Sequence, residues 1–298
     1  MSAALLLKNV SKQYGQEYVV DKINIQVNSG EIFGFCGPNG SGKTTTIRMI
    51  LNTIYPSEGQ ISIFGRENTI FLSRQSVGFL SGDMAFEDEL SGSEYLQFVA
   101  DVYKKNCLTQ INNLSELLEI DLSIKIRHLS RGNRQKIGLV AALMHDPKLL
   151  ILDEPTSGFD PLIQNKFVEL IQAFRDKGGT VFMSSHILSE VQKLCDRVAF
   201  IKEGKVIDIK TVLEFEKLSA KYLRVQARQA EIERIQKEHV KIKHLKLITK
   251  TSTTAEFHFY GDAKPILQFF ASYKLQDITI RDQDLHQIFS NYYEDSHV

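Results

Sequence analysis

The chain lacks several features that would assign it to a particular class of protein. No apolar run approaches the roughly 18 residues that a helix needs to cross a bilayer. Lys plus Arg and Asp plus Glu both number 36, so the formal net charge is zero and nucleic-acid binding through counterion release is not expected. Three cysteines without CxxC spacing indicate neither a disulfide framework nor a zinc site. The N-terminal apolar stretch follows no cationic segment and breaks at Lys8, which argues against a signal peptide, so we expect a cytoplasmic protein that meets a membrane only through a partner.

What the chain does contain is an alternation of strand-like and helix-like segments over its first two-thirds. The segments KLLILDEP and GTVFMSSH are uninterrupted apolar strands, as expected where helices cover both faces of a parallel sheet. Strands that alternate with helices favour an α/β fold built on a largely parallel sheet, which we assign to a first domain, residues 1–215. Helices are expected between residues 90 and 129. Their packed side is predicted to consist of Leu96, Phe98, Val99, Val102 and Tyr103.

The composition changes after Phe215, where a second domain, residues 216–298, is predicted. Its segments follow the order β-α-β-β-α-β, which is typical of a small α+β, ferredoxin-like sandwich. A closing helix is expected over DLHQIFSNYY, residues 284–293. No pattern in this domain indicates a catalytic site, so we expect an accessory role.

The strongest functional motif is GPNGSGKT, residues 37–44, which fits G-x-x-x-x-G-K-[ST] in full. A predicted strand precedes it and a predicted helix follows it, as a P-loop requires. Its glycines let successive backbone N–H groups turn toward phosphate oxygens, and the start of the following helix adds a positive dipole end. Lys43 is predicted to reach the β- and γ-phosphates of a nucleotide, and Thr44 to offer its hydroxyl to Mg²⁺.

Two acidic residues and a histidine follow two further predicted strands. LLILDEP delivers Asp153 and Glu154 to the carboxyl end of a buried strand, where open α/β sheets place their ligands. Asp153 can hold Mg²⁺, and Glu154 can polarise the water that attacks the γ-phosphate. His186 follows TVFMSS and can hydrogen-bond that water and a γ-phosphate oxygen. The competing interpretation, in which the carboxylates only cap a turn, is disfavoured beside a complete P-loop. A purely structural role for His186 is disfavoured by its place 32 residues after Glu154, on the next predicted strand.

The stretch LSRGNRQK, residues 129–136, distinguishes this chain from other P-loop enzymes. It precedes the predicted helix IGLVAALMHDP, so Ser130 and Gly132 can offer a hydroxyl and a backbone N–H to a phosphate at a helix start. With its spacing from LLILDEP and from SGFD, residues 157–160, the stretch resembles the LSGGQ signature of ABC-type ATPases. The resemblance covers residues 3–215, with the motifs in the family's order.

The resemblance implies a fold and a set of nucleotide contacts. The fold is a P-loop NTPase (RecA-like) core with an antiparallel β-subdomain and a helical subdomain. In this family the signature loop binds ATP held by the opposite subunit, the aspartate matched by Asp160 crosses the dimer interface, and the aromatic residue matched by Tyr14 stacks on adenine. A core position for Tyr14 is the competing interpretation. The residues assigned to nucleotide binding are Tyr14, Gly37, Pro38, Asn39, Gly40, Ser41, Gly42, Lys43, Thr44, Thr45, Ser130, Gly132 and Asp160.

The resemblance also implies cofactors and partners. These are ATP with Mg²⁺, a second ATPase subunit that is identical or related, and an integral membrane permease that would hold the chain on the inner face of the cell membrane. The second domain looks like the extension on ATPases of ABC-2-type exporters, and its DLHQIFSNYY is similar to their LEEIFLxYY ending. Export of a drug, a peptide antibiotic, a lantibiotic or a lipid-like cargo is therefore favoured over import, and the second domain is expected to regulate or stabilise dimerisation.

An alternative of another class is a soluble ABC-type ATPase that acts on ribosomes or DNA. A single P-loop, the lack of a heptad run and the zero net charge disfavour it, and no nucleic-acid partner is expected.

The sequence also departs from the family's pattern in two places. Gly82, between Ser81 and Asp83, stands where a magnesium-binding glutamine is usual, and Arg131 and Asn133 replace Gly and Gln of the signature. We therefore expect intact ATP binding with modest turnover.

Overall fold

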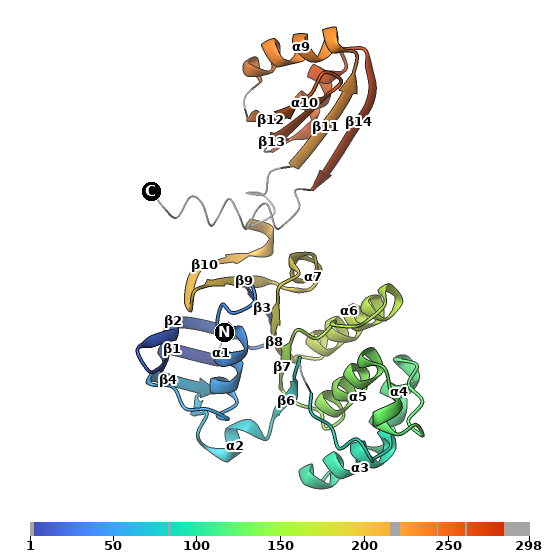
Figure 1. Ribbon diagram of the computed structural model, residues 1–298. Coiled ribbons are helices and arrows are strands. Elements are labelled where there is room, and N and C mark those ends of the chain that lie inside the picture. Colours follow the sequence, from blue (N-terminus) through green and yellow to red (C-terminus); the bar gives the residue numbers. More distant parts are fainter. Residues whose placement is uncertain (1–2, 83, 215–220, 243, 260, 283–298) are drawn as a thin grey trace. The chain divides into compact units, whose positions relative to one another are not determined.

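The computed structural model describes residues 3–82, 84–214, 221–242, 244–259 and 261–282 (Figure 1). The chain divides into two compact units, Met1–Val212 and Leu213–Val298, and each has its own hydrophobic core. Every helix in the described ranges is too short or too polar to span a bilayer.

Two sheets form the N-terminal unit. The larger one has the strand order β10-β9-β3-β8-β7-β6 and is parallel except for its β9–β10 pair. The smaller one, β2-β1-β4-β5, is antiparallel throughout. The bounds of these strands are β1 Ala3–Tyr14, β2 Glu17–Asn28, β3 Ile32–Cys36, β4 Glu58–Ile63, β5 Arg66–Glu67, β6 Val77–Leu80, β7 Leu149–Asp153, β8 Thr180–Ser185, β9 Arg197–Lys202 and β10 Lys205–Thr211.

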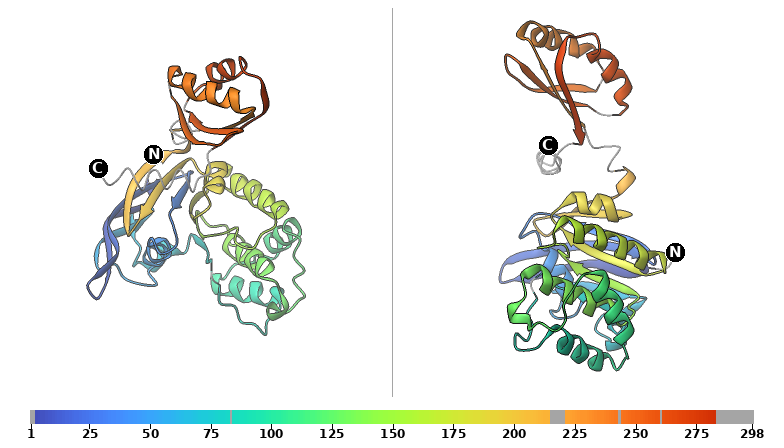
Figure 2. Two further views of the ribbon diagram at one scale, coloured as in Figure 1. Left: turned by 45° about the horizontal axis from the view of Figure 1, so that its top comes forward. Right: turned by 90° about the vertical axis from the view of Figure 1, so that its right-hand side faces the viewer.

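Helices cover both faces of the larger sheet, as the apolar strands predict. Helices α5 and α6 lie on one face, while α1 lies on the other face, between the larger and the smaller sheet (Figure 1). Figure 2 shows the green helices of residues 92–143 gathered on one side of this unit. The helix bounds are α1 Lys43–Ile50, α2 Phe71–Arg74, α3 Gly92–Tyr103, α4 Leu108–Leu117, α5 Arg131–Leu143, α6 Pro161–Asp176 and α7 Leu188–Leu194.

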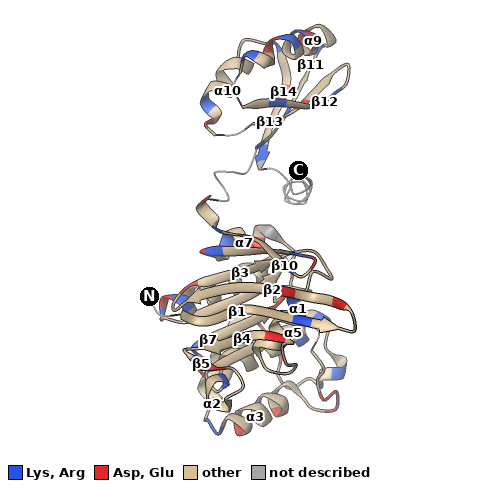
Figure 3. Cartoon of the chain, turned by 90° about the vertical axis from the view of Figure 1, so that its left-hand side faces the viewer, with Lys and Arg blue, Asp and Glu red and all other residues tan. Residues whose placement is uncertain are grey.

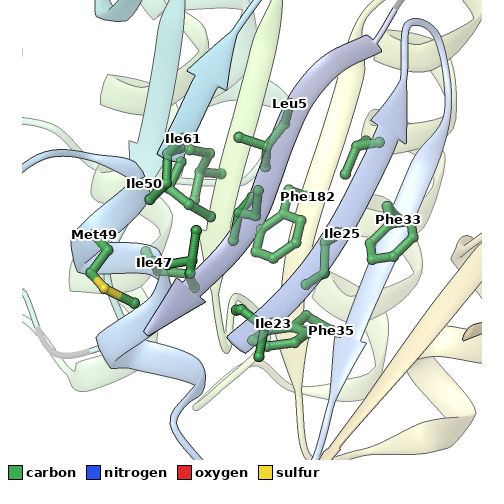
Figure 4. Close-up of a cluster of buried hydrophobic side chains, with 14 of the residues drawn as sticks. Leu5, Ile23, Ile25, Phe33, Phe35, Ile47, Met49, Ile50, Ile61 and Phe182 are labelled. Atoms are coloured by element: carbon green, nitrogen blue, oxygen red, sulfur yellow. The ribbon is translucent and has the colours of Figure 1, made fainter. Parts of the chain in front are cut away.

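The core of the N-terminal unit lies between its two sheets and α1 (Figure 4). Ile47 and Ile50 of α1 are fully buried there beside Leu5 and Ile25 of the smaller sheet. From the larger sheet, the ring of Phe182 stacks on Phe33 and tilts against Phe35, with ring centroids 6.0 and 5.5 Å apart. Apolar side chains of β3, β7 and β8 can be buried on both faces because these strands carry no charge before Asp153 at the very end of β7 (Figure 3).

The helical segment after β6 differs from the expectation in which side of α3 is buried. Leu96 and Ala100 face the unit's interior, whereas Phe98 and Val102 are 60% and 64% exposed. The predicted packed face is therefore wrong for these two residues. Ser91 begins α3 with a capping box, because its side chain accepts from Glu94 N while the Glu94 carboxylate accepts from Ser91 N.

The C-terminal unit has the predicted order of elements. Its antiparallel sheet β12-β13-β11-β14 places the first and third strands side by side in the centre, which is the ferredoxin-like arrangement. The inner face of the sheet packs Leu223, Phe257 and Phe259 against Ile232 and Phe270 of the helices. The expected closing helix, residues 284–293, lies outside the described residues. The bounds in this unit are β11 Lys221–Ala227, α9 Gln229–Glu238, β12 Leu245–Lys250, β13 Thr254–Phe259, α10 Ala263–Phe270 and β14 Leu275–Asp282.

Candidate functional site: the ends of three adjacent strands

The P-loop connects β3, near the middle of the larger sheet, to α1. Gly37 N donates to Ser185 O at 3.4 Å, which ties the start of the loop to the neighbouring strand β8. Gly42 is the N-cap of α1 at φ 104°, and a β-carbon there would lie 2.7 Å from Val19 O, so only glycine satisfies both the left-handed backbone and the close approach. Ser41 Oγ is buried and has no hydrogen-bond partner among the described residues, so its hydroxyl can bond a phosphate oxygen.

Hydrogen bonds to the P-loop backbone hold the side chain of Lys43 in place. Its ammonium donates to Gly37 O at 2.8 Å and to Pro38 O at 3.0 Å, and the side chain is only 5% exposed. Lys43 Nζ also lies 3.7 Å from Glu154 Oε1. The ammonium is thus oriented across the mouth of the P-loop toward the end of β7.

The carboxylate of Asp153 receives two hydroxyls from neighbouring elements. Thr44 Oγ1 donates to Asp153 Oδ2 at 2.9 Å, and Ser184 Oγ donates to Asp153 Oδ1. Asp153 and Ser184 are buried, so these bonds compensate for removing the carboxylate from water. Ser184, near the end of β8, is a residue that the sequence analysis missed. Its place one position before the strand end, beside the strand LLILD, is the signal that could have identified it.

Glu154 and His186 form a pair at the rim of this group. His186 Nδ1 lies 3.2 Å from Glu154 Oε1, the same oxygen that faces Lys43. The backbone of Glu154 has φ 47°, a left-handed conformation that costs a non-glycine residue about 1–3 kcal/mol. Ser184 supports it, because Glu154 N donates to Ser184 Oγ at 3.1 Å and to Ser184 O at 3.2 Å.

A cavity of about 680 Å³ extends from this group toward the start of α5. Gly82 lines it, and a β-carbon at this position would lie 2.9 Å from Asp153 O. The glycine therefore lets the chain run directly against the end of β7, where the family's glutamine would need a local shift. Of the two substitutes considered for that glutamine, Ser81 lines the cavity and Asp83 lies outside the described residues.

The signature stretch is part of a helix instead of preceding one. Helix α5 begins at Arg131, and the side chain of Ser130 caps it by accepting from Asn133 N at 3.3 Å. Asp160 has the same role for α6, where it accepts from Leu162 N and Ile163 N. No hydrogen bond or ion pair in the described ranges joins Ser130, Gly132 or Asp160 to the P-loop of the same chain.

Tyr14 lies at the end of β1, in the hairpin with β2. Its side chain is 52% exposed, which excludes the competing interpretation of a core residue. Lys12 Nζ lies 5.1 Å from the centroid of its ring. The strand that follows Tyr14 contains Val19, whose carbonyl borders Gly42, so the hairpin reaches the P-loop.

The residues present fit a magnesium–nucleotide complex. Thr44 and Asp153 offer oxygen atoms, which Mg²⁺ prefers. No cluster of three or more His, Cys, Asp or Glu that could hold a metal occurs within the described part of the chain. Such a pair supplies only part of an octahedral shell, as in sites where phosphate oxygens and water complete it.

Known proteins are similar to this chain in both sequence and fold. Residues 20–157 match the family described as ABC transporter. The uncharacterized ABC transporter ATP-binding protein YhcH of Bacillus subtilis (strain 168) is 39% identical over 217 residues, which are 71% of each chain. The chain belongs to the ATP-binding proteins of ABC transporters. The bacitracin transport ATP-binding protein BcrA of Bacillus licheniformis is 38% identical to this ABC ATPase over 234 residues, 76% of each chain.

Solved structures confirm the predicted P-loop NTPase fold of the ABC ATPase. The structure of an ATP-binding subunit of an ABC transporter has a TM-score of 0.68 and 28% identity, and covers 72% of this chain and 92% of that one. A dimeric bacterial ABC transporter cassette has a TM-score of 0.65 over 70% of this chain and 98% of that one; at 22% identity it supports the fold alone. As a member of this family, the ABC ATPase binds and hydrolyses ATP to power transport.

Proposed function

We propose that this ABC ATPase drives an exporter, and that Lys43, Asp153, Glu154 and His186 are the residues of its hydrolytic site. One observation carries the assignment. Lys43 Nζ and His186 Nδ1 both face Glu154 Oε1, at 3.7 and 3.2 Å, beside the Asp153–Thr44 pair. An ammonium, an imidazole and two carboxylates then meet where a P-loop ends.

Each residue has a distinct task in this proposal. Lys43 and the P-loop amides bind the β- and γ-phosphates. Lys43 Nζ and His186 Nδ1 both lie near Glu154 Oε1, so we assign Oε2 to the attacking water, from which it accepts a hydrogen bond. His186 orients that water and the γ-phosphate, and the products are ADP and phosphate. Thr44 and Asp153 would hold Mg²⁺, which supplies positive charge to the phosphates.

A second subunit completes the nucleotide site. Ser130 and Gly132 lie at the start of α5, and Asp160 at the start of α6, so all three present helix N-termini. We assign these groups to the ATP bound by the partner subunit's P-loop, in a dimer that closes on ATP and opens after hydrolysis. Tyr14, exposed beside the P-loop, is assigned to the adenine ring.

The permease partner is assigned to the helical segment. Phe98 and Leu108, which are 60% and 59% exposed, border a groove of about 500 Å³ between α3 and α4. Large apolar side chains that stay exposed next to a groove are typical of protein interaction sites. Docking there would hold the ABC ATPase at the inner face of the membrane.

The cargo class is proposed from the relatives. BcrA is named for bacitracin transport, and LnrL of Bacillus subtilis, 36% identical over 216 residues, is named for linearmycin resistance. We propose an antibiotic or a similar amphiphilic molecule as the exported cargo. We assign residues 1–215 to nucleotide binding and residues 216–298 to regulation of the dimer.

Two measurements test the proposal. Glu154→Gln should lower kcat for ATP by roughly 10²–10⁴-fold and should accumulate an ATP-bound dimer in light scattering. The control Glu169→Gln makes the same change at an exposed position of α6 and should keep wild-type turnover. A Glu154→Gln chain that hydrolyses ATP normally, or that stays monomeric with ATP, would refute the site assignment. Affinity purification from native membranes should recover an integral membrane protein, whereas ribosomes or DNA would support the soluble alternative.

A further inference from the structure

Glu190 links the two loops that carry the proposed hydrolytic pair. It lies on α7, outside every motif of the sequence, and its carboxylate accepts two hydroxyls. Thr156 Oγ1 donates to Glu190 Oε1, and Ser185 Oγ donates to Glu190 Oε2 at 2.9 Å. Thr156 follows Glu154 by two residues, and Ser185 directly precedes His186, so a single carboxylate joins both loops.

The Ser185 hydroxyl has one other acceptor within reach, Ile187 O at 3.1 Å, and the carboxylate is the nearer of the two. Thr156 is 6% exposed and Ser185 is 1% exposed, so water cannot replace the carboxylate without local opening. Hydrogen bonds to a charged acceptor are roughly twice as strong as neutral ones. Ser185 Oγ also accepts from Ile187 N at 2.9 Å, which fixes the backbone on both sides of His186.

Helix α7 itself is held tightly against the strand that leads into the P-loop. Val191 is fully buried, and a β-carbon on Gly34 of β3 would lie 2.9 Å from its Cγ1 and 3.0 Å from Cys195 Sγ. Burial, with a smaller contribution from the charge of Glu190, raises the pKa of the Cys36 thiol to about 12 against the effect of Lys43. The carboxylate therefore acts from a fixed place close to the end of β3.

We propose that Glu190 is a positioning residue for ATP hydrolysis, which sets the placement of Glu154 relative to His186 through Thr156 and Ser185. The proposal rests on the roles proposed above for Glu154 and His186. Glu190 touches neither nucleotide nor water; it acts only through these two residues. If Glu190 only anchored α7, its replacement would lower the stability of the fold and the affinity for ATP together. The resulting loss of kcat would then add to the loss caused by replacing His186.

The first test separates turnover from binding in the full-length chain. Glu190→Gln keeps the size of the side chain but removes the charge and points an amide at a buried hydroxyl. We expect kcat to fall roughly 10- to 100-fold, the effect of a small misplacement of reacting groups. The ATP dissociation constant measured by calorimetry should change less than about threefold, because the P-loop contacts remain. Glu169→Gln, the exposed control on α6, should change neither value.

The second test asks whether Glu190 acts through His186. In a His186→Ala background, Glu190→Gln should lower kcat less than about threefold further, since residues that act as a unit are not additive. Thr156→Val removes one hydroxyl without changing the shape of the side chain, and should lower kcat with unchanged ATP affinity even if Glu190→Gln folds poorly. Additive losses in the double variant, or normal turnover in Glu190→Gln and Thr156→Val, would overturn the proposal.

These outcomes are distinct from a failure of the proposed site. A wild-type chain without ATPase activity, or an active Glu154→Gln chain, would overturn both proposals. Activity that is lost in Glu154→Gln but normal in Glu190→Gln would overturn the positioning role alone.

Discussion

The backbone of Gly132 lies directly against the backbone of Gly158. A β-carbon on Gly132 would be 2.4 Å from Gly158 O, and Gly158 itself has φ 85°, a conformation that favours glycine. The contact joins the start of α5 to the loop between β7 and α6. Ser130 and Asp160, both assigned to the dimer interface, are therefore fixed relative to each other within one subunit.

Replacing Gly132 by alanine should weaken ATP-driven dimerisation without weakening ATP binding to the P-loop. The added methyl group would force the two loops apart, at a cost of about 1–3 kcal/mol. This corresponds to a change of roughly 5- to 150-fold in the dimerisation constant. Light scattering of Gly132→Ala in the Glu154→Gln background measures the dimer, and calorimetry measures ATP affinity. Glu169→Ala, at an exposed position of α6, is the control. A Gly132→Ala chain that dimerises like the control would contradict the coupling.

Removing the hydroxyl of Ser184 should impair the magnesium-dependent step. Ser184→Ala deprives the buried Asp153 carboxylate of one donor, a loss of about 1–3 kcal/mol for an unsatisfied buried group. We expect kcat to fall about tenfold, and the Mg²⁺ concentration for half-maximal ATPase activity to change as well. Ser115→Ala is a matched control, since Ser115 Oγ is buried without a hydrogen-bond partner in the described ranges. An unchanged magnesium titration together with a normal kcat would rule out this role for Ser184.

Acidic substitutions on the exposed side of α3 should detach the chain from its membrane partner and leave its fold intact. Phe98→Asp and Val102→Asp change side chains that are 60% and 64% exposed, so the free energy of unfolding should stay within about 0.5 kcal/mol of wild type. Recovery of the permease in membrane pull-downs should be lost. Val240→Asp, at a residue that is 76% exposed, should keep it. Equal recovery with all three variants would place the permease elsewhere.

His145 should make the fold sensitive to mild acid. The side chain is buried, stacks on Tyr103 with ring centroids 3.9 Å apart, and has Nε2 3.3 Å from Val77 O. Burial lowers the pKa of His145 below its ordinary 6.5, although the carbonyls of Val77 and Ala141 oppose the shift. Below pH 6.5 the unfolded chain therefore binds a proton that the folded chain does not, and stability falls as the pH falls.

The measurement is the free energy of unfolding of the wild-type chain and His145→Gln between pH 7 and pH 5. The variant is less stable at pH 7 because it loses the ring stack, but its stability should fall less steeply with acid. Parallel pH profiles would show that His145 is not the group that titrates.

Much of the site was predictable because strand ends are visible in a sequence. LLILD and TVFMSS are apolar strands that stop at a polar residue, so the positions of Asp153, Glu154 and His186 at one edge of a parallel sheet follow from the pattern. The alternation of elements likewise predicts the order of the ferredoxin-like unit, and the structure confirms it.

Contacts between distant segments were not predictable. Glu190 meets Thr156 and Ser185 only because α7 folds back over the sheet, and no local pattern encodes that return. The prediction from apolar periodicity was also wrong on α3. It assigns apolar residues at helical spacing to the core, but Phe98 and Val102 are exposed. Apolar side chains at helical spacing can belong to a core face or to an exposed patch, so the sequence alone does not separate the two.

Three neighbouring strands, β3, β8 and β7, lead into the segments that carry Lys43, His186 and the two carboxylates. The ends of these strands are separated by the spacing of the sheet's backbone ladder, about 4.8 Å between neighbouring strands. The sheet therefore fixes the distances between the strand ends, and the packed rings of Phe33, Phe35 and Phe182 stabilise it. Arg131, at the start of α5, lies outside these strands, so a change there would leave their spacing intact, whereas a side chain at Gly82 would press against Asp153 O at the end of β7.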